Sequence, residues 1–207
     1  GSLLSTEPPP DYTTLAAPPA GATDRDGHMT DSFLRQETES LYHELVRSLS
    51  AEHRARVEHI PFHFVEDASE PNAAAGCAAG SSAPMVMVTS SMLTMAAAAA
   101  ETRAYDELGS TNTYEAYASS VLTALSSGRP VPGVGSGSIT GALATDRRKL
   151  ARQRHLFDEE LAFILGHELA HHYRGHTGCA GRAPATREEA ENFERMLSTT
   201  IPPLEQP

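Results

Sequence analysis

The segment His167–His171 reads His-Glu-Leu-Ala-His, and this spacing constrains the chain more than any other feature of its sequence. On a helix, residues four apart lie on the same face, so both imidazoles can reach one metal ion. Glu168 lies about 100° round the helix from His167, where its carboxylate can contact a metal-bound water and act as a general base. The segment therefore predicts a helix that carries a catalytic site with Zn²⁺ as its cofactor.

The residues before this motif favour a helix that is packed into the protein. Asp158–Glu160 are acidic residues suited to a helix N-terminus. A stripe at helical spacing then runs through the motif and is expected to carry it into the core; it consists of Leu161, Ile164, Leu165, Glu168, Leu169 and His172. The alternative, a surface helix that happens to hold two histidines, would lack this stripe.

Two blocks of the sequence resemble one known family. Glu160–His176 is similar to the motif ELAxVLxHExxHxxxxH of the gluzincin zinc peptidases of family M48, which include the HtpX heat-shock peptidase, the CAAX prenyl endopeptidase and periplasmic quality-control peptidases. Pro71–Ala75 followed by Met85–Leu93 is similar to that family's PNAFA and IxVxxGLL segments, in the same order. The resemblance implies a zincin-like metallopeptidase domain.

A rival class of zinc enzymes does not fit the residues after the motif. Metzincins place glycine three and histidine six residues after the second histidine, where this chain has Arg174 and Thr177. His176 has two interpretations. The resemblance implies a histidine near the site at this offset, and the alternative is a helix C-terminal residue favoured by the helix dipole.

The third zinc ligand is less clearly marked than the first two. Catalytic zinc uses three protein ligands and an open position, and the resemblance implies a glutamate from a later helix. The family pattern Glu-x-x-Ala-Asp is closest to Arg187–Glu191, which has arginine at the ligand position. We take Glu191 as the candidate ligand. The remaining interpretations are a solvated helix in which Glu191 pairs with Arg195, or a ligand beyond residue 207. Other acidic residues that follow the motif are Glu188, Glu189 and Glu194.

Composition bounds the fold class and the partners. The chain has 207 residues, a net charge of −11 and abundant alanine, which favours a mostly helical α+β domain. The resemblance adds a small mixed sheet packed on the helix with the His-Glu-x-x-His motif. The negative charge and the lack of a basic stripe exclude nucleic acid as a partner. No feature predicts an oligomeric state.

The chain divides into a tail and one domain. Residues 1–28 are rich in proline and are expected to form a disordered tether, and residues 29–207 form a single peptidase domain. A helix is expected from Thr30 or Asp31 to Leu49, and strands are expected at 60–65 and 85–89. Residues 93–157 are expected to form a helical insertion, with helices at 93–108 and 114–125 and a glycine-rich loop at 128–138.

Location is predicted from the apolar segments and the family. Met85–Ala100 is the longest apolar stretch, but polar residues interrupt it and it is shorter than the about 20 apolar residues that a membrane span needs. The resemblance then implies the soluble periplasmic or lipoprotein branch, so we expect an extracytoplasmic protein with a lipid anchor upstream. It also brings Cys77 and Cys179 near the cleft, which implies a disulfide. Two free thiols or a soft metal ligand are the alternatives.

The leading hypothesis is a zinc-dependent endopeptidase acting on unfolded or extracytoplasmic proteins. His167, His171 and Glu191 would hold the metal and Glu168 would be the general base. Met85–Thr89 is expected to be the edge strand along which an extended substrate pairs. The alternatives are a non-catalytic binding or scaffold protein of the same fold with an incomplete metal site, and a small-molecule hydrolase.

Overall fold

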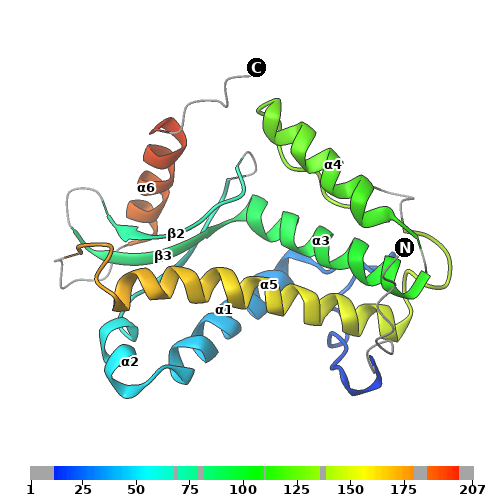
Figure 1. Ribbon diagram of the computed structural model, residues 1–207, viewed down its shortest axis with the longest axis horizontal. Coiled ribbons are helices and arrows are strands. Elements are labelled where there is room, and N and C mark those ends of the chain that lie inside the picture. Colours follow the sequence, from blue (N-terminus) through cyan, green and yellow to red (C-terminus); the bar gives the residue numbers. More distant parts are fainter. Residues whose placement is uncertain are drawn as a thin grey trace, which may run out of the picture.

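The computed structural model describes residues 12–67, 70–78, 82–109, 111–135, 139–179 and 186–200, without the side chains of 197–200. These residues form a mostly helical α+β domain with one small mixed sheet, as the sequence predicts (Figure 1). In chain order the elements are η1 Tyr12–Thr14, α1 Asp31–Ser48, α2 Ala51–Val57, β1 Phe62–Val65, β2 Ala73–Cys77, β3 Pro84–Thr89, α3 Ser90–Gly109, α4 Thr113–Ser126, α5 Arg147–Tyr173 and α6 Arg187–Thr200.

The sheet has the strand order β1-β3-β2. β1 runs parallel to β3 and β2 runs antiparallel to it. Our expectation that Met85–Thr89 forms the edge strand is therefore wrong, because β3 is the central strand and is buried along its whole length. An unbroken apolar run is typical of a strand covered on both faces. The edge strand beside α5 is the alanine-rich β2, which is not among the strands expected from the sequence.

The two faces of the sheet are covered by different helices. Val86 and Val88 face the core that contains α5, whereas Met85 and Met87 face α6, as strand alternation requires. Gly76 of β2 makes room for α6, since a Cβ there would lie 2.4 Å from the ring of Phe193. α5 and α6 consequently lie on opposite faces of the sheet (Figure 1).

Capping residues fix where the long helices begin. Thr30 Oγ1 accepts a hydrogen bond from the backbone N–H of Phe33 at 3.3 Å, which confirms the predicted start of α1. α5 begins earlier than expected. Its N-cap is Asp146, whose side chain accepts from the N–H of Arg148 at 2.8 Å, so Asp158–Glu160 lie in the middle of the helix and not at its N-terminus.

The segment expected to be a helical insertion belongs to the core of the domain. The two predicted helices are present as α3 and α4. Ala96, Ala100 and Ala104 of α3 are buried in the cluster that contains the leucines of α5, and their small side chains let the two helices approach closely. Val131 of the glycine-rich loop is buried against α4. None of the described helices has the length and apolar content needed to cross a bilayer.

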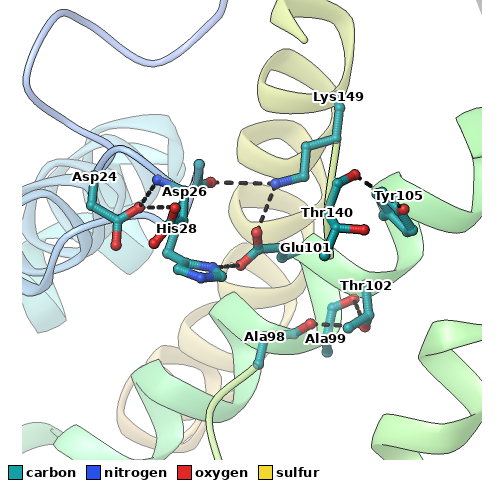
Figure 2. Close-up of polar contacts among 11 residues, drawn as sticks. Asp24, Asp26, His28, Ala98, Ala99, Glu101, Thr102, Tyr105, Thr140 and Lys149 are labelled. Carbon is teal, nitrogen blue, oxygen red and sulfur yellow. Dashed lines mark hydrogen bonds and ion pairs between the residues drawn. The ribbon is translucent and has the colours of Figure 1, made fainter. Parts of the chain in front are cut away.

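The predicted tether needs a correction at its C-terminal end. Residues 1–11 lie outside the described residues, but residues 12–28 lie against the domain. Ala22 is buried, and Thr23 forms a β-bridge with Met29. His28 Nδ1 lies 2.8 Å from the buried carboxylate of Glu101 (Figure 2). A buried carboxylate requires polar partners, and the segment before α1 supplies one of them.

Candidate metal centre

The histidine pair lies on the outer side of a helix whose inner side is deeply buried. Leu161, Leu165 and Leu169 of α5 are at most 1% exposed. His167 lies on the opposite side of the helix and is exposed, and His171 is half-buried. The apolar stripe therefore anchors α5 in the core, as predicted, while the two imidazoles remain accessible to solvent and to a metal ion.

The two imidazoles converge on one point. Their Nε2 atoms lie 3.1 Å apart, with the ring planes at 81° to each other. Two nitrogen ligands of a tetrahedral zinc ion, each at about 2.05 Å from the metal, would be separated by about 3.4 Å. The pair therefore fits two ligand positions of zinc with only a small adjustment, and one shared cation would use the lone pairs of both rings.

Glu168 is held against the free edge of the sheet. Its Oε2 accepts a hydrogen bond from the backbone N–H of Ala75 at 2.8 Å. The N–H of Thr89 donates to the carbonyl of Asn72, so these two residues form a hydrogen-bonded pair of the antiparallel ladder. Along an antiparallel strand, backbone groups point alternately toward and away from the neighbouring strand. Those of Ala75, three residues after Asn72, therefore point away from β3. The predicted general base thus lies where backbone groups of β2 point away from the sheet.

A tight turn after α5 returns the chain to the site. Gly175 adopts φ +75°, and its N–H donates to the carbonyl of His172 at 2.9 Å, while the N–H of His176 donates to the carbonyl of His171 at 2.8 Å. These bonds form a Schellman motif, which favours glycine. The turn places His176 Nδ1 3.3 Å from His171 Nδ1. His176 thus contacts the pair and can orient the His171 ring from behind, as second partners of metal-bound histidines do.

His172, which the helical spacing places on the buried stripe, has a structural role. Its Nε2 donates to the carbonyl of Met85 at 2.8 Å, and Thr177 Oγ1 lies 3.2 Å from its Nδ1. Because a carbonyl only accepts, Nε2 carries the hydrogen. Burial lowers the pKa of His172 and keeps the ring neutral. His172 therefore fixes the C-terminal end of α5 to the central strand, and its spacing of three from Leu169 is the signal that places it on the buried side.

The disulfide predicted from the family resemblance is present. Cys77 at the end of β2 is bonded to Cys179 in the segment after α5. This result rules out two free thiols and a cysteine metal ligand. The bond joins the strand that contacts Glu168 to the segment that carries His176, so both sides of the histidine pair are tied together.

The structure does not bring Glu191 to the histidine pair. Ala190 and Phe193 pack α6 against the sheet face opposite α5, which puts the sheet between the two helices. Glu191 Oε1 instead lies 3.0 Å from Arg187 Nε. Within the described ranges, no three side chains from histidine, cysteine, aspartate and glutamate gather as a metal-binding group. The described site thus comprises His167, His171 and Glu168, and Glu191 as the third ligand stays a prediction.

Glu194 is the acidic residue of α6 that packs inward. It is 2% exposed, and its Oε2 accepts a hydrogen bond from Asn72 Nδ2 at 3.1 Å. This contact joins α6 to the residue just before β2. Glu194 therefore has a structural partner on the α6 side of the sheet, away from the histidine pair.

Comparison with known proteins gives one match. Residues 35–181 match the sequence model described as Peptidase family M48. This range contains α1 from its second turn onward, the whole sheet, α3, α4, α5 and the turn with His176. No curated protein and no solved structure gives a significant match to the chain.

Proposed function

Because this chain belongs to peptidase family M48, we propose that it is a zinc-dependent endopeptidase that hydrolyses peptide bonds of unfolded or extracytoplasmic proteins. One observation carries the proposal. Two imidazole Nε2 atoms converge at 3.1 Å on the same helix face, and the adjacent carboxylate of Glu168 accepts a hydrogen bond from the N–H of Ala75 in the neighbouring edge strand. Metal ligands, base and strand edge thereby meet at one place.

His167 and His171 would hold Zn²⁺ through Nε2, with a carboxylate as third ligand. Bound there, the ion would lower the pKa of a water molecule and polarise a peptide carbonyl. Glu168 would take a proton from that water and deliver it to the leaving amine. His176 would keep the His171 ring in its orientation. The contacts of His167, His171, Glu168 and His176 support these roles.

The free edge of β2 would align the substrate. Its outward-pointing backbone groups can pair with an extended chain, and such pairing reads little side-chain identity. A folded protein rarely offers an unpaired extended segment, whereas an unfolded one does. The edge strand therefore supports the part of the proposal that names unfolded proteins as substrates.

We extend the proposal to location, in the periplasm or as an outer-membrane lipoprotein. The Cys77–Cys179 disulfide supports this, because such bonds persist in oxidising compartments and are rare in the cytosol. Mass spectrometry of protein isolated from cell fractions, under conditions that trap thiols, tests it. Recovery of a reduced cytosolic form would contradict the proposed location.

Zinc content and casein cleavage test the activity. We expect about one zinc ion per chain and cleavage that a chelator abolishes. Glu168→Gln is expected to retain the zinc and lose about a hundredfold or more of the activity, because it removes the proton acceptor. Glu115→Gln, an exposed substitution on α4, is the control. Zinc-loaded protein whose cleavage rate is unaffected by Glu168→Gln would overturn the proposed mechanism.

A non-catalytic binding protein of the same fold is the second candidate. One observation favours it: Arg187 stands at the ligand position of the Glu-x-x-Ala-Asp pattern, and no third metal ligand joins the histidine pair among the described residues. This candidate predicts a chain without stoichiometric zinc that binds unfolded casein but does not cleave it. The same two measurements therefore separate the two functions.

A further inference from the structure

An open groove lies along α5, in the turns that precede the histidine pair. Three helices line it, α3, α4 and α5, and its volume is about 490 Å³. Two of its aromatic side chains are unusually exposed, Phe163 at 78% and Tyr114 at 43%. Large apolar surface in contact with water is unfavourable and marks an interaction site when polar groups surround it.

The sequence explains why a groove forms here. Ala99 and Ala100 of α3 line the groove and carry no side chain beyond Cβ, so neither fills it. Tyr114 on the opposite wall is fixed by its backbone, because Asp106 Oδ2 accepts from its N–H at 2.7 Å. Ile164 adds a half-buried apolar surface next to Phe163. The groove is therefore formed before any ligand arrives.

Two residues of the groove lie one helical turn before the candidate metal centre. Phe163 and His167 are four residues apart on α5, and so are Ile164 and Glu168. Four residues of a helix rise about 6 Å along its axis. Two residues of an extended chain span about 6.6 Å. A substrate residue about two positions from the bond above His167 thus comes level with Phe163.

The charged residues around the groove indicate which kind of ligand it can bind. Glu159 and Glu160 stand on its α5 side. Arg103 is the opposing cation, but its Nε also lies 3.5 Å from Glu107 Oε1. The rim therefore carries more negative than positive charge and repels an acidic ligand.

We propose that this groove is a specificity pocket that takes a large apolar side chain, aromatic or leucine-like, of an extended polypeptide substrate about two residues from the cleaved bond. Acidic residues at that position are disfavoured. The inference rests on the proposed function, since it names which unfolded segments the site selects. It differs from recognition by β2, because the groove reads a side chain and the strand edge reads the backbone.

Cleavage of a mixed peptide library by the zinc-loaded protein tests the proposal. We expect phenylalanine, tyrosine and leucine to be enriched at one position within three residues of the cleaved bond, and aspartate and glutamate to be depleted there. Phe163→Ser should reduce the preference for phenylalanine over serine by about tenfold or more, the range expected for one large apolar contact. Leu122→Ser changes a similarly exposed apolar residue on α4 outside the groove and should leave the preference unchanged.

A binding measurement separates failure of this inference from failure of the proposed function. Fluorescence anisotropy compares a labelled lysine- and alanine-rich peptide carrying one phenylalanine with the same peptide carrying aspartate. If the protein cleaves nothing but binds the first peptide at least tenfold more tightly, and Phe163→Ser removes the difference, the activity fails and the pocket stands. Equal binding of both peptides, or a preference that survives Phe163→Ser, overturns the pocket. So does a dimer in solution that Phe163→Ser dissociates, because a second copy would then occupy the groove.

Discussion

Lys149 Nζ lies 2.7 Å from Glu101 Oε1, and the two side chains are 0% and 3% exposed (Figure 2). The other carboxylate oxygen of Glu101 lies 2.8 Å from His28 Nδ1. Lys149 Nζ also lies 3.3 Å from the carbonyl oxygen of Gly27. Gly27 has φ +84°, and a Cβ there would lie 2.1 Å from the carbonyl oxygen of Ala144. One buried ion pair thus joins α3, α5 and the segment before α1.

Lys149→Met is expected to destabilise the protein by about 3 kcal/mol, because it leaves the Glu101 carboxylate buried without its cation. Urea unfolding followed by circular dichroism measures this. The double variant Lys149→Met, Glu101→Leu should recover most of the loss, since both charges are then removed. Arg148→Met changes the exposed neighbour and should have little effect. If Lys149→Met is as stable as the wild type, the ion pair between Lys149 and Glu101 contributes nothing to stability.

Asp158 gives the protein a pH-dependent stability. Burial and the nearby Glu37 raise the pKa of Asp158 to about 7, against 3.8 for the free group. The native state therefore binds more protons than the unfolded state between these values, and stability falls as pH rises through that window. Arg154 lies 3.8 Å from Asp158 and opposes the shift.

Between pH 5 and pH 8, the free energy of unfolding of Asp158→Asn is expected to fall by about 2 kcal/mol less than that of the wild type. This is less than the full shift would give, because 31% of the side chain meets solvent. Chemical unfolding at a series of pH values measures it. Glu159→Gln, one residue along the helix, is the matched control. An unchanged slope in Asp158→Asn would place the titrating group elsewhere.

Zinc affinity tests whether Glu191 of α6 is the third metal ligand. With Glu191 on the far side of the sheet and paired with Arg187, Glu191→Ala should leave zinc affinity unchanged. His171→Ala should abolish tight binding, because it removes one of the two convergent nitrogens. Calorimetric titration of zinc into metal-free protein measures both. A large loss of affinity in Glu191→Ala would mean that α6 moves to the histidine pair when metal binds.

The disulfide should contribute strongly to stability. It closes a loop of 102 residues, which restricts the unfolded chain, and we expect its reduction to cost about 2–5 kcal/mol. Comparison of urea unfolding with and without reductant measures this, and Cys77→Ala with Cys179→Ala gives the reductant-free control. Equal stability of the oxidised and reduced forms would contradict the expectation.

Local sequence signals are sufficient for much of the helical framework. Thr30 caps α1 because its hydroxyl can accept from a nearby N–H, whatever the rest of the chain does. The helices at 93–108 and 114–125 follow from alanine content and apolar spacing. The start of α5 is not predicted, because the acidic residues at 158–160 are as compatible with a helix interior as with an N-terminus.

The sequence by itself determines that His167 and His171 share a helix face with Glu168 beside them, and the leucine stripe decides which side of α5 is buried. Spacing alone suffices for this because the helix repeat is fixed. Only the tertiary structure decides that β2 is the edge strand, that Ala75 holds Glu168, that Gly175 returns His176 to His171, and that the sheet separates α6 from the site. These relationships join residues far apart in the chain, so they depend on how the sheet is ordered and which of its faces each helix covers.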